Sequence, residues 1–495
     1  MAPSPPATRH SPLATISFGT DGWRGVIADD FTHENVRTVA YAIARYVVRA
    51  ENPTAGVLVG YDNRYSSERF ARTAADALTA AGIPVYLAEQ SAPTPAISLL
   101  VRQRRAAGGI VITASHNPAI WNGMKYKASY GSSALPSIVA QIEQELALVL
   151  RDGVPALPPR PALLHSLDVR APYLETLDKL VDWDRLKAAG YRFLIDPMHG
   201  SGAGLLKALF DRHGIPCEEI RGRRDPLFGG VNPEPIEPHI EPMRAAIRAG
   251  RFQAGFAMDG DADRIGAMDS DGTFVNPHQI LSILLWHLAG TRNIPGDVAK
   301  TFSVTKLVDK LAAKFGRKLH ETPVGFKYIC ELMLERDILL GGEESGGIGT
   351  KLHLPERDAT VSALLLAEVL AWHRKSLGEI LRDLHAEFGE HHFGRVDLTL
   401  APGQKEKVLE YVANRSLTRF LDADVCHRED LDGVKLYLGD VGGSARQAGA
   451  SPRQAAWIML RGSGTEPMLR LYAETPSAAF TRDILDRAAA FVRSL

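Results

Sequence analysis

The 495-residue sequence is poor in the features that mark secreted or nucleic-acid-binding proteins. It has only three cysteines, Cys217, Cys330 and Cys426, and their wide spacing forms neither a disulfide framework nor a zinc site. Such sparse cysteine favours a reducing compartment. Lys and Arg (57) nearly balance Asp and Glu (58), so a net charge of −1 gives no electrostatic basis for binding nucleic acid or an anionic membrane.

Long hydrophobic runs are also missing. The two longest apolar stretches, 280–288 and 361–372, contain His287 and Glu368 and are too short to span a bilayer. The N-terminal segment is rich in Pro, Ser and Ala and lacks the apolar centre of a signal peptide. We therefore expect a cytoplasmic protein with a disordered tail over residues 1–13 and with no membrane or nucleic-acid partner.

A strand, a helix and a second strand recur in the same order three times along the chain. The three copies are Gly56–Gly60, Glu68–Ala81 and Gly82–Ala88; Phe193–Asp196, Gly204–His213 and Gly214–Ile220; and Val298–Val304, Lys306–Phe315 and Gly316–Glu321. In each copy a glycine follows the helix, where a left-handed backbone is favoured. Strands alternating with helices predict three α/β units with largely parallel sheets.

After about residue 390 the pattern changes. Alternating or apolar runs at 392–400, 434–440 and 456–461 predict strands, and residues 477–495 predict a closing amphipathic helix. We expect an α+β unit there, with an antiparallel sheet.

Two proline-rich segments punctuate the chain. Gly153–Ala162 has four prolines in ten residues and predicts a linker, whereas Asp225–Pro242 interrupts the second unit. The predicted organisation is four domains, three similar α/β domains and a smaller α+β domain. Their predicted limits are 14–160, 161–272, 273–388 and 389–495.

Two polar loops follow predicted strands, at the edge where α/β sheets bind ligands. TASHNP (Thr113–Pro118) holds Ser115 and His116, and Lys125 follows it; taken alone, this loop fits an ordinary turn. DGDADR (Asp259–Arg264) places three carboxylates at alternate positions, which is costly unless a cation neutralises them. The acidic loop lacks the glutamate of an EF-hand, so we favour a Mg²⁺ site with open positions.

Three further segments could contact an anion or a sugar. GGEESGG (Gly341–Gly347) sets two carboxylates and a hydroxyl among glycines, which suits a polyhydroxylated ligand or a mobile surface loop equally well. RGSGTEP (Arg461–Pro467) has the charge and backbone donors that a phosphate needs, although a hairpin turn also explains its glycines. FGTDGWRG (Phe18–Gly25) contains Arg24 among glycines.

Together the loops supply a hydroxyl nucleophile, a metal loop, a sugar loop and a phosphate cradle. This combination points to phosphoryl transfer on a polyhydroxylated substrate at a cleft between four domains.

The motifs TASHNP, DGDADR, GEESGG and RGSGTEP resemble, in order and spacing, those of the α-D-phosphohexomutase superfamily, over essentially the whole chain after the tail. The resemblance implies four domains around a central cleft, carrying in turn a phosphoserine, the metal, the sugar contacts and a phosphate site. It also implies Mg²⁺ and glucose 1,6-bisphosphate as activator, sugar phosphates as partners, and a monomer or homodimer.

The resemblance implies a role for each matching residue. Ser115 matches the phosphoserine, and its oxygen completes a Mg²⁺ ligand set with Asp259, Asp261 and Asp263. The matching catalytic residues are Ser115, His116, Lys125 and Arg24. Of these, Lys125 matches a proposed general acid/base. The matching substrate contacts are Arg264, Lys327 in VGFKY, Glu343, Ser345, Arg461, Ser463, Gly464 and Thr465.

The sugar loop favours glucose. In dual glucose/mannose members this loop ends in His, where the chain has Gly347, and a glucosamine mutase more typically has Gln at the place of Glu344. We therefore expect a phosphoglucomutase, with mannose as an additional or alternative substrate. A phosphotransferase that mainly makes glucose 1,6-bisphosphate would carry the same residues. A non-catalytic sugar-phosphate-binding protein is disfavoured, because a binder has no need of Ser115.

Overall fold

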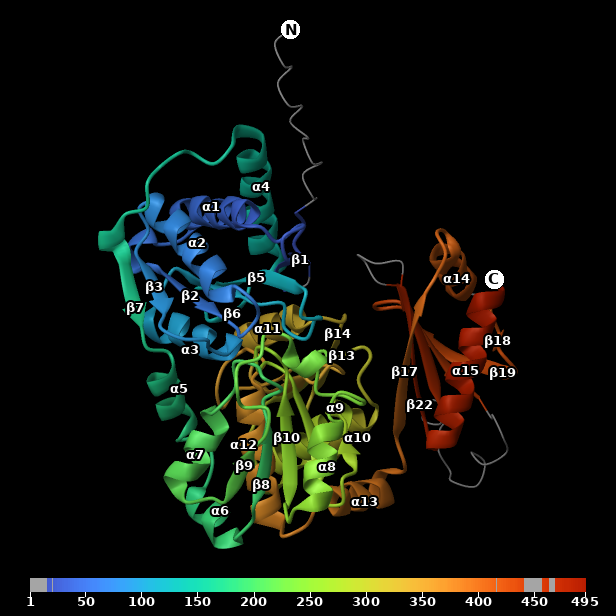
Figure 1. The fold of residues 1–495 in the computed structure, drawn as a ribbon. Coiled ribbons are helices and arrows are strands. Elements are labelled where there is room, and N and C mark those ends of the chain that lie inside the picture. Colours follow the sequence, from blue (N-terminus) through green and yellow to red (C-terminus); the bar gives the residue numbers. More distant parts are fainter. Residues whose placement is uncertain (1–15, 20, 415, 440–455, 463–467) are drawn as a thin grey trace.

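The computed structural model describes residues 16–19, 21–414, 416–439, 456–462 and 468–495. Its elements form four sheets with helices packed against them, three α/β units followed by an α+β unit (Figure 1). The predicted fold class is confirmed. The predicted tail, 1–13, lies outside the described residues. Within the described part of the chain, every helix is too short or too polar to cross a membrane.

The first unit contains a seven-stranded sheet and four helices. Its strands are β1 (Trp23–Val26), β2 (Val57–Tyr61), β3 (Val85–Ala88), β4 (Gly108–Ile112), β5 (Trp121–Ala128), β6 (Ser132–Ser133) and β7 (Leu164–Leu167), and its helices are α1 (His33–Ala50), α2 (Ser67–Ala80), α3 (Thr94–Arg104) and α4 (Pro136–Asp152). Strand β7 pairs with β3 in parallel. The predicted boundary at residue 160 therefore falls before the last strand of this sheet, because the proline-rich segment that precedes β7 crosses the surface of the first unit and does not leave it.

The second and third units repeat the central part of this arrangement. The second contains β8 (Phe193–Asp196), β9 (Cys217–Glu219), β10 (Ala254–Met258), β11 (Ile265–Asp269), β12 (Phe274–Val275), α5 (Arg170–Leu177), α6 (Trp183–Ala189), α7 (Leu205–His213) and α8 (Glu241–Ala249). The third contains β13 (Asp297–Thr301), β14 (Leu319–Thr322), β15 (Ile338–Gly342), β16 (Ile348–Thr350), α9 (Pro277–Leu285), α10 (Leu307–Lys314), α11 (Phe326–Glu335), α12 (Ala359–His373) and α13 (Leu377–Phe388).

The three sheets share one strand order. It reads β5-β4-β2-β3 in the first unit, β11-β10-β8-β9 in the second and β16-β15-β13-β14 in the third. Of the four strands in each order, the three that come first in the sequence are parallel. The fourth follows directly in the sequence and pairs antiparallel with the third. The sheets are thus mixed, where the sequence predicted largely parallel ones. The glycines expected after the helices, Gly82, Gly214 and Gly316, all have positive φ.

One apolar core runs through the three α/β units. It joins residues of α3, α7, α9 and α12, and 13 of the 15 residues of α12 are buried. A helix that is apolar on all sides is stable only where other elements surround it. The three units therefore form one body.

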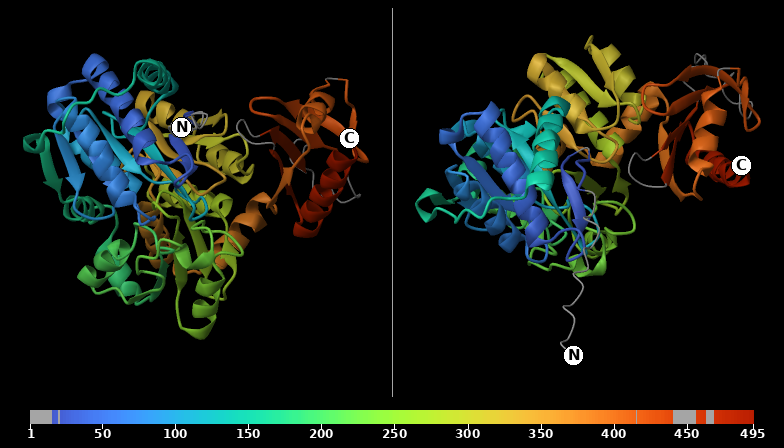
Figure 2. Two further views of the ribbon diagram at one scale, coloured as in Figure 1. Left: turned by 45° about the horizontal axis from the view of Figure 1, so that its top comes forward. Right: turned by 90° about the horizontal axis from the view of Figure 1, so that it is seen from above.

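The fourth unit has an all-antiparallel six-stranded sheet, as predicted. It contains β17 (His392–Thr399), β18 (Arg419–Phe420), β19 (Ala423–Glu429), β20 (Val434–Leu438), β21 (Trp457–Gly462), β22 (Met468–Thr475), α14 (Gln404–Ala413) and α15 (Ala478–Ser494). It has its own core and lies beside the third unit, set apart from the first two (Figure 2). A small apolar cluster that includes Phe302, Tyr437 and Trp457 joins the third and fourth units.

Candidate active site

Three of the predicted loops occupy the same place in the repeated topology. TASHNP joins β4 to β5, DGDADR joins β10 to β11, and GGEESGG joins β15 to β16, so each lies where a parallel strand turns into the antiparallel one. Each loop also contains one residue with positive φ, namely Ser115 (+54°), Ala262 (+56°) and Gly346 (+94°). Such backbone conformations are uncommon for non-glycine residues and concentrate at functional sites.

The first two loops are in direct contact. The hydroxyl of Ser115, which is 1% exposed, donates to Asp259 Oδ2 at 2.7 Å. The close approach requires glycine at position 260, since a Cβ there would lie 2.5 Å from the carbonyl oxygen of Ser115. The backbone N–H of Gly260 donates to the carbonyl of Pro233, so the proline-rich segment 225–242 supports the acidic loop.

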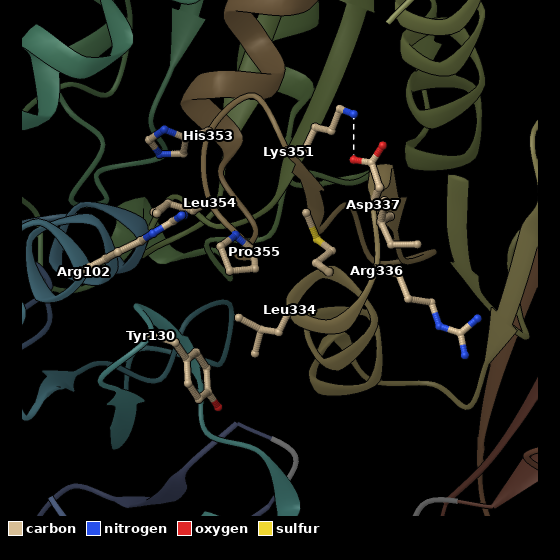
Figure 3. Close-up of a pocket in the computed structure, with 11 residues that line it drawn as sticks. Arg102, Tyr130, Leu334, Arg336, Asp337, Lys351, His353, Leu354 and Pro355 are labelled. Atoms are coloured by element: carbon tan, nitrogen blue, oxygen red, sulfur yellow. Dashed lines mark hydrogen bonds and ion pairs between the residues drawn. The ribbon is translucent and has the colours of Figure 1, made fainter. Parts of the chain in front are cut away.

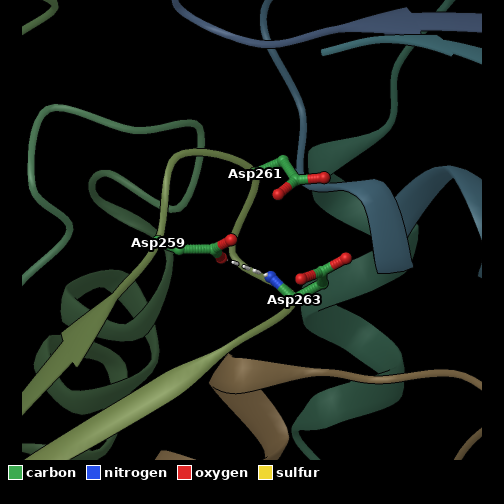
Figure 4. Close-up of side chains that lie close together, drawn as sticks. All are labelled: Asp259, Asp261 and Asp263. Atoms are coloured by element: carbon green, nitrogen blue, oxygen red, sulfur yellow. Dashed lines mark hydrogen bonds between the residues drawn. The ribbon is translucent and has the colours of Figure 1, made fainter. Parts of the chain in front are cut away.

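The acidic loop gathers three buried carboxylates. The ligand atoms of Asp259, Asp261 and Asp263 lie within 4.8 Å of one another (Figure 4). Asp261 Oδ1 and Asp263 Oδ1 are buried without a hydrogen-bond partner within the described part of the chain. Burial and the two neighbouring carboxylates raise the pKa of Asp259 well above its usual range. Three buried carboxylates, two of them with an oxygen that lacks a hydrogen-bond partner in the described part of the chain, fit a divalent cation such as Mg²⁺.

Two positively charged side chains from the other α/β units compensate the negative charge of these carboxylates. Lys125 Nζ lies 2.8 Å from Asp261 Oδ2, 3.0 Å from Asp263 Oδ2 and 2.9 Å from Asp21 Oδ2. Burial disfavours the ammonium, but the three carboxylates outweigh it and hold the pKa of Lys125 above its usual range. In this arrangement Lys125 is a charged hydrogen-bond donor.

The second cation, Arg357, links all three α/β units. Its guanidinium lies 2.6 Å from Asp21 Oδ2, 2.9 Å from Asp263 Oδ2 and 3.3 Å from Glu343 Oε2. Glu343, in the sugar loop, is 5% exposed, and burial raises its pKa to about 7. The neighbouring Glu344 accepts hydrogen bonds from the hydroxyls of two residues at the end of β13 and just after it, Thr301 at 3.1 Å and Ser303 at 2.7 Å.

The TASHNP loop, which holds the predicted nucleophile Ser115, is called the nucleophile loop below. Its backbone is held by a fully buried arginine. Arg64 donates to the carbonyl oxygens of Ser115 at 2.6 Å and Asn117 at 2.7 Å through Nη2, and to those of Pro118 at 2.8 Å and Trp121 at 3.0 Å through Nη1. Its Nε lies 3.1 Å from a carboxylate oxygen of Asp62. Four carbonyls are therefore fixed by one side chain.

The remaining predicted catalytic residues lie around this loop. His116 Nδ1 is 3.4 Å from Ser115 Oγ, and burial together with nearby arginines holds the pKa of His116 well below its usual range. The imidazole is thus neutral. Arg24 donates to Asn117 Oδ1, and Arg264 lies beside Asp263 at 3.8 Å.

Three other predicted residues that the structure describes, Lys327, Ser345 and Arg461, make no hydrogen bond or ion pair with this cluster in the described part of the chain. The ammonium of Lys327, in the first turn of α11, lies 5.1 Å from the centre of the Tyr328 ring, and Ser345 is half-buried in the sugar loop. Arg461 lies in the fourth unit, where its Nε is 3.0 Å from Asp432 Oδ1. Ser463, Gly464 and Thr465 lie outside the described residues.

Sequence reasoning missed Asp21, Arg64 and Arg357. Arg64 had a usable signal, since Asp62, Asn63 and Arg64 form a polar run directly after β2, as the other site loops follow their strands. Asp21 stands in the quoted FGTDGWRG segment. Arg357 precedes the Asp358 cap of α12 and had no comparable signal.

Comparison with known proteins places the whole chain in one group. Models of the phosphoglucomutase/phosphomannomutase α/β/α domains I, II and III match residues 15–149, 171–272 and 276–388, and the model of the C-terminal domain matches residues 440–491.

Three of the similar proteins carry three different substrate names. A phosphoglucomutase of Komagataeibacter xylinus is 27% identical, covering 94% of this chain and 88% of the other. A phosphoglucosamine mutase of Polaromonas sp. is 30% identical, covering 96% and 99%. A crystal structure from Thermus thermophilus, provisionally assigned as a phosphomannomutase, is 34% identical, with a TM-score of 0.82 and coverage of 97% and 99%.

Proposed function

The chain belongs to the phosphoglucomutase/phosphomannomutase family, and we propose that within this family of phosphohexomutases it interconverts glucose 1-phosphate and glucose 6-phosphate through a phosphoserine at Ser115. The observation that carries the proposal is the hydrogen bond of 2.7 Å from the buried Ser115 hydroxyl to Asp259, which brings this hydroxyl of TASHNP against the acidic loop of another unit.

The proposed reaction has two phosphoryl transfers that balance. Phosphorylated Ser115 gives its phosphoryl group to the 6-hydroxyl of glucose 1-phosphate. This transfer forms glucose 1,6-bisphosphate and leaves a free Ser115 hydroxyl. The bisphosphate turns over, and the phosphoryl group at its other end returns to Ser115, leaving glucose 6-phosphate. His116, a neutral nitrogen base beside Ser115, and Lys125, a charged donor, are our candidates for the accompanying proton transfers.

Mg²⁺ is the proposed cofactor. Asp259, Asp261 and Asp263 would hold it together with an oxygen of phosphorylated Ser115, because two of these carboxylates have buried oxygens without a hydrogen-bond partner in the described part of the chain. When bound, it would supply positive charge that stabilises the transferring phosphoryl group. We propose Arg24 and Arg264 as further positive charges for that group.

The sugar is held at two other places in the proposal. Glu343 and Ser345 would accept and donate hydrogen bonds to its hydroxyl groups, and Arg461, with Ser463, Gly464 and Thr465, would bind the non-reacting phosphate. Lys327 would add a second phosphate contact. Since the non-reacting phosphate stands on either end of the sugar in turn, a fixed anchor in the fourth unit serves both half-reactions.

The nucleophile is tested by Ser115→Ala against Ser137→Ala, an exposed serine of α4 in the same unit. After incubation with glucose 1,6-bisphosphate, intact-mass spectrometry should find one phosphate on the wild-type chain and on Ser137→Ala, and none on Ser115→Ala. We expect Ser115→Ala to lose mutase turnover while keeping its fold, because the substitution removes the nucleophile but removes no contact of the hydrophobic core. A Ser115→Ala enzyme with wild-type turnover would refute the assignment.

The substrate is tested by a panel of hexose 1-phosphates. Glucose, mannose, glucosamine and N-acetylglucosamine 1-phosphates are assayed with and without glucose 1,6-bisphosphate, and glucose 1-phosphate should give the highest kcat/KM. A preference for mannose would match the assignment of the Thermus relative, and a preference for glucosamine would match the Polaromonas one. Either preference would overturn glucose as the main substrate.

A further inference from the structure

A cavity lies between the first and third units, away from the cluster around Ser115. Its volume is about 400 Å³, and its lining includes Arg102, at the C-terminal end of α3, and Lys351, just after β16 (Figure 3). Ile338, the first residue of β15, also lines it, whereas Glu343 follows the last residue of that strand. At about 3.3 Å per residue, the cavity and the sugar loop are about 15 Å apart on opposite ends of β15.

The cavity is lined by more cations than anions. Arg102, Arg336 and Lys351 stand against a single carboxylate, that of Asp337. Lys351 Nζ lies 2.7 Å from Asp337 Oδ1, whose side chain is 65% exposed, while Arg102 and Arg336 pair with no carboxylate in the described part of the chain. The side chain of Arg102 extends toward Leu354, whereas the side chain of Arg336 points away from Arg102 (Figure 3).

A buried histidine in the lining also lacks a hydrogen bond. The side chain of His353 is only 2% exposed, and neither ring nitrogen has a hydrogen-bond partner within the described part of the chain, although Nε2 lies 3.2 Å from Asp358 Oδ2. Buried polar groups in native proteins are nearly always hydrogen-bonded, so an unsatisfied imidazole at a cavity wall indicates a ligand atom or water beside it.

We propose that this cavity binds a small phosphorylated anion and that the bound anion regulates the active site. Cavities of roughly 300–1,000 Å³ accommodate small metabolites. Arginine forks recognise phosphate oxygens in pairs of hydrogen bonds, and Leu334, Leu354 and Pro355 offer an apolar wall for the carbon skeleton. Binding does not depend on the proposed mutase function, whereas the regulatory part rests on it.

The coupling runs through the segment 351–357. Its first half lines the cavity, and its second half enters the active-site network: Glu356 lies 2.8 Å from Lys127 Nζ, and Arg357 pairs with Asp263 and Glu343. Helix α3 makes a second link. Arg102 is near its C-terminal end, and the Thr94 hydroxyl at its N-terminal end donates to Asp261 Oδ2 at 2.5 Å. A ligand that moves the first half of the segment therefore moves Arg357.

Binding can be observed at the cavity itself, because Met333 lies in its lining. We would record the methyl resonances of isotope-labelled methionines in the full chain, assign Met333 with Met333→Leu, and titrate phosphoglycolate, which has a phosphate but no sugar ring. The Met333 resonance should shift saturably with a Kd below about 1 mM. Sodium chloride at equal ionic strength, and malonate as a purely carboxylate anion, should give smaller shifts.

Variants locate the binding. The double variant R102Q/R336Q should weaken the Kd at least about tenfold, whereas Arg104→Gln, an exposed arginine on the same helix, should leave it unchanged. Arg461→Ala should also leave the Met333 shift unchanged, because its side chain lies in the fourth unit. Absence of a saturable shift, or an equal shift in R102Q/R336Q, would overturn the binding site, and loss of the shift in Arg461→Ala would assign the binding to the active site instead.

The regulatory part is tested by mutase turnover at saturating sugar phosphate. Phosphoglycolate should change kcat of the wild-type enzyme at least about twofold, and R102Q/R336Q should abolish this change. Binding at Met333 without any change in kcat would overturn the coupling. A chain with no mutase activity on any hexose phosphate would overturn the proposed function and the regulation, while the binding result would stand by itself.

Discussion

Arg64→Met is expected to unfold the nucleophile loop and to destabilise the first unit. The substitution keeps an unbranched apolar stem but removes four hydrogen bonds to buried backbone carbonyls and the partner of Asp62. A buried acceptor left without its donor costs about 1 kcal/mol or more, and an uncompensated buried carboxylate adds to this. The expected loss in the free energy of unfolding is therefore about 4–6 kcal/mol.

The assay is urea unfolding of the full chain, followed by tryptophan fluorescence. With a slope of about 2–3 kcal/mol per molar urea, the transition of the first unit should begin about 2 M earlier than in the wild type. Phosphorylation of Ser115 by glucose 1,6-bisphosphate, measured by intact mass, should fall as well, because the loop backbone is no longer fixed. Arg72→Met, which removes an exposed pair with Asp76, is the matched control and should cost less than about 0.5 kcal/mol.

Arg64→Lys separates the charge from the geometry of the side chain. A lysine keeps the positive charge beside Asp62 but cannot reach four carbonyls with one planar fork. It should lie between the wild type and Arg64→Met in both measurements. If Arg64→Met unfolds within about 1 kcal/mol of the wild type and is phosphorylated at the wild-type rate, the loop is held by other contacts and the reasoning is refuted.

Three further outcomes follow from the site and its surroundings. Exhaustive chelation should stop turnover without unfolding the chain, and full activity of the metal-free enzyme would contradict the Mg²⁺ site at Asp259, Asp261 and Asp263. Arg461→Ala should lower kcat/KM about ten- to a hundredfold in both directions, through loss of a charge-assisted phosphate contact worth about 1.5–3 kcal/mol, while Ser115 is still phosphorylated; unchanged kinetics would place the phosphate anchor elsewhere. Burial lowers the pKa of His278 to about 4, and its Nδ1 accepts from the Thr305 N–H, so folding favours the neutral ring. Between pH 6.5 and 4 the unfolded chain then binds more protons than the folded one, so the free energy of unfolding should fall by about 3 kcal/mol as the pH is lowered across this range. His278→Gln should flatten this fall in urea titrations, and a slope equal to that of the wild type would refute the prediction.

The tandem α/β pattern could be predicted from the sequence because each unit repeats the same local signals. An apolar strand, a helix of 3.6-residue period and a glycine with positive φ after the helix are all encoded within about thirty residues. The turn of β5 back against β4 had no such signal, because Trp121–Ala128 is rich in polar residues, of which Lys125 and Lys127 find carboxylate partners in other units. Mixed sheets therefore could not be distinguished from parallel ones.

The residues of the candidate site also form two groups, those that short sequence motifs identify and those that only distant contacts identify. Ser115 and the three aspartates of the acidic loop stand in short motifs whose residue types already limit their chemistry. The four carbonyl partners of Arg64 lie 51–57 residues away, and Arg357 meets Asp21 across 336 residues. The polar run after β2 could have marked Arg64 as a site residue, but neither arginine carries a local sign of its distant partners, which only the folded arrangement identifies.

The placement of α12 and Arg357 near the end of the three-unit body has a consequence for protein synthesis. Asp21 leaves the ribosome 336 residues before Arg357, an interval of about 17–67 s at 5–20 residues per second. In the last part of this interval the nascent chain already carries Ser115 and the acidic loop, but the acidic loop lacks its guanidinium partner and the core lacks α12. A chain truncated before residue 359 would thus present a large apolar surface to chaperones, and a nonsense mutation there should yield aggregation and no partial enzyme.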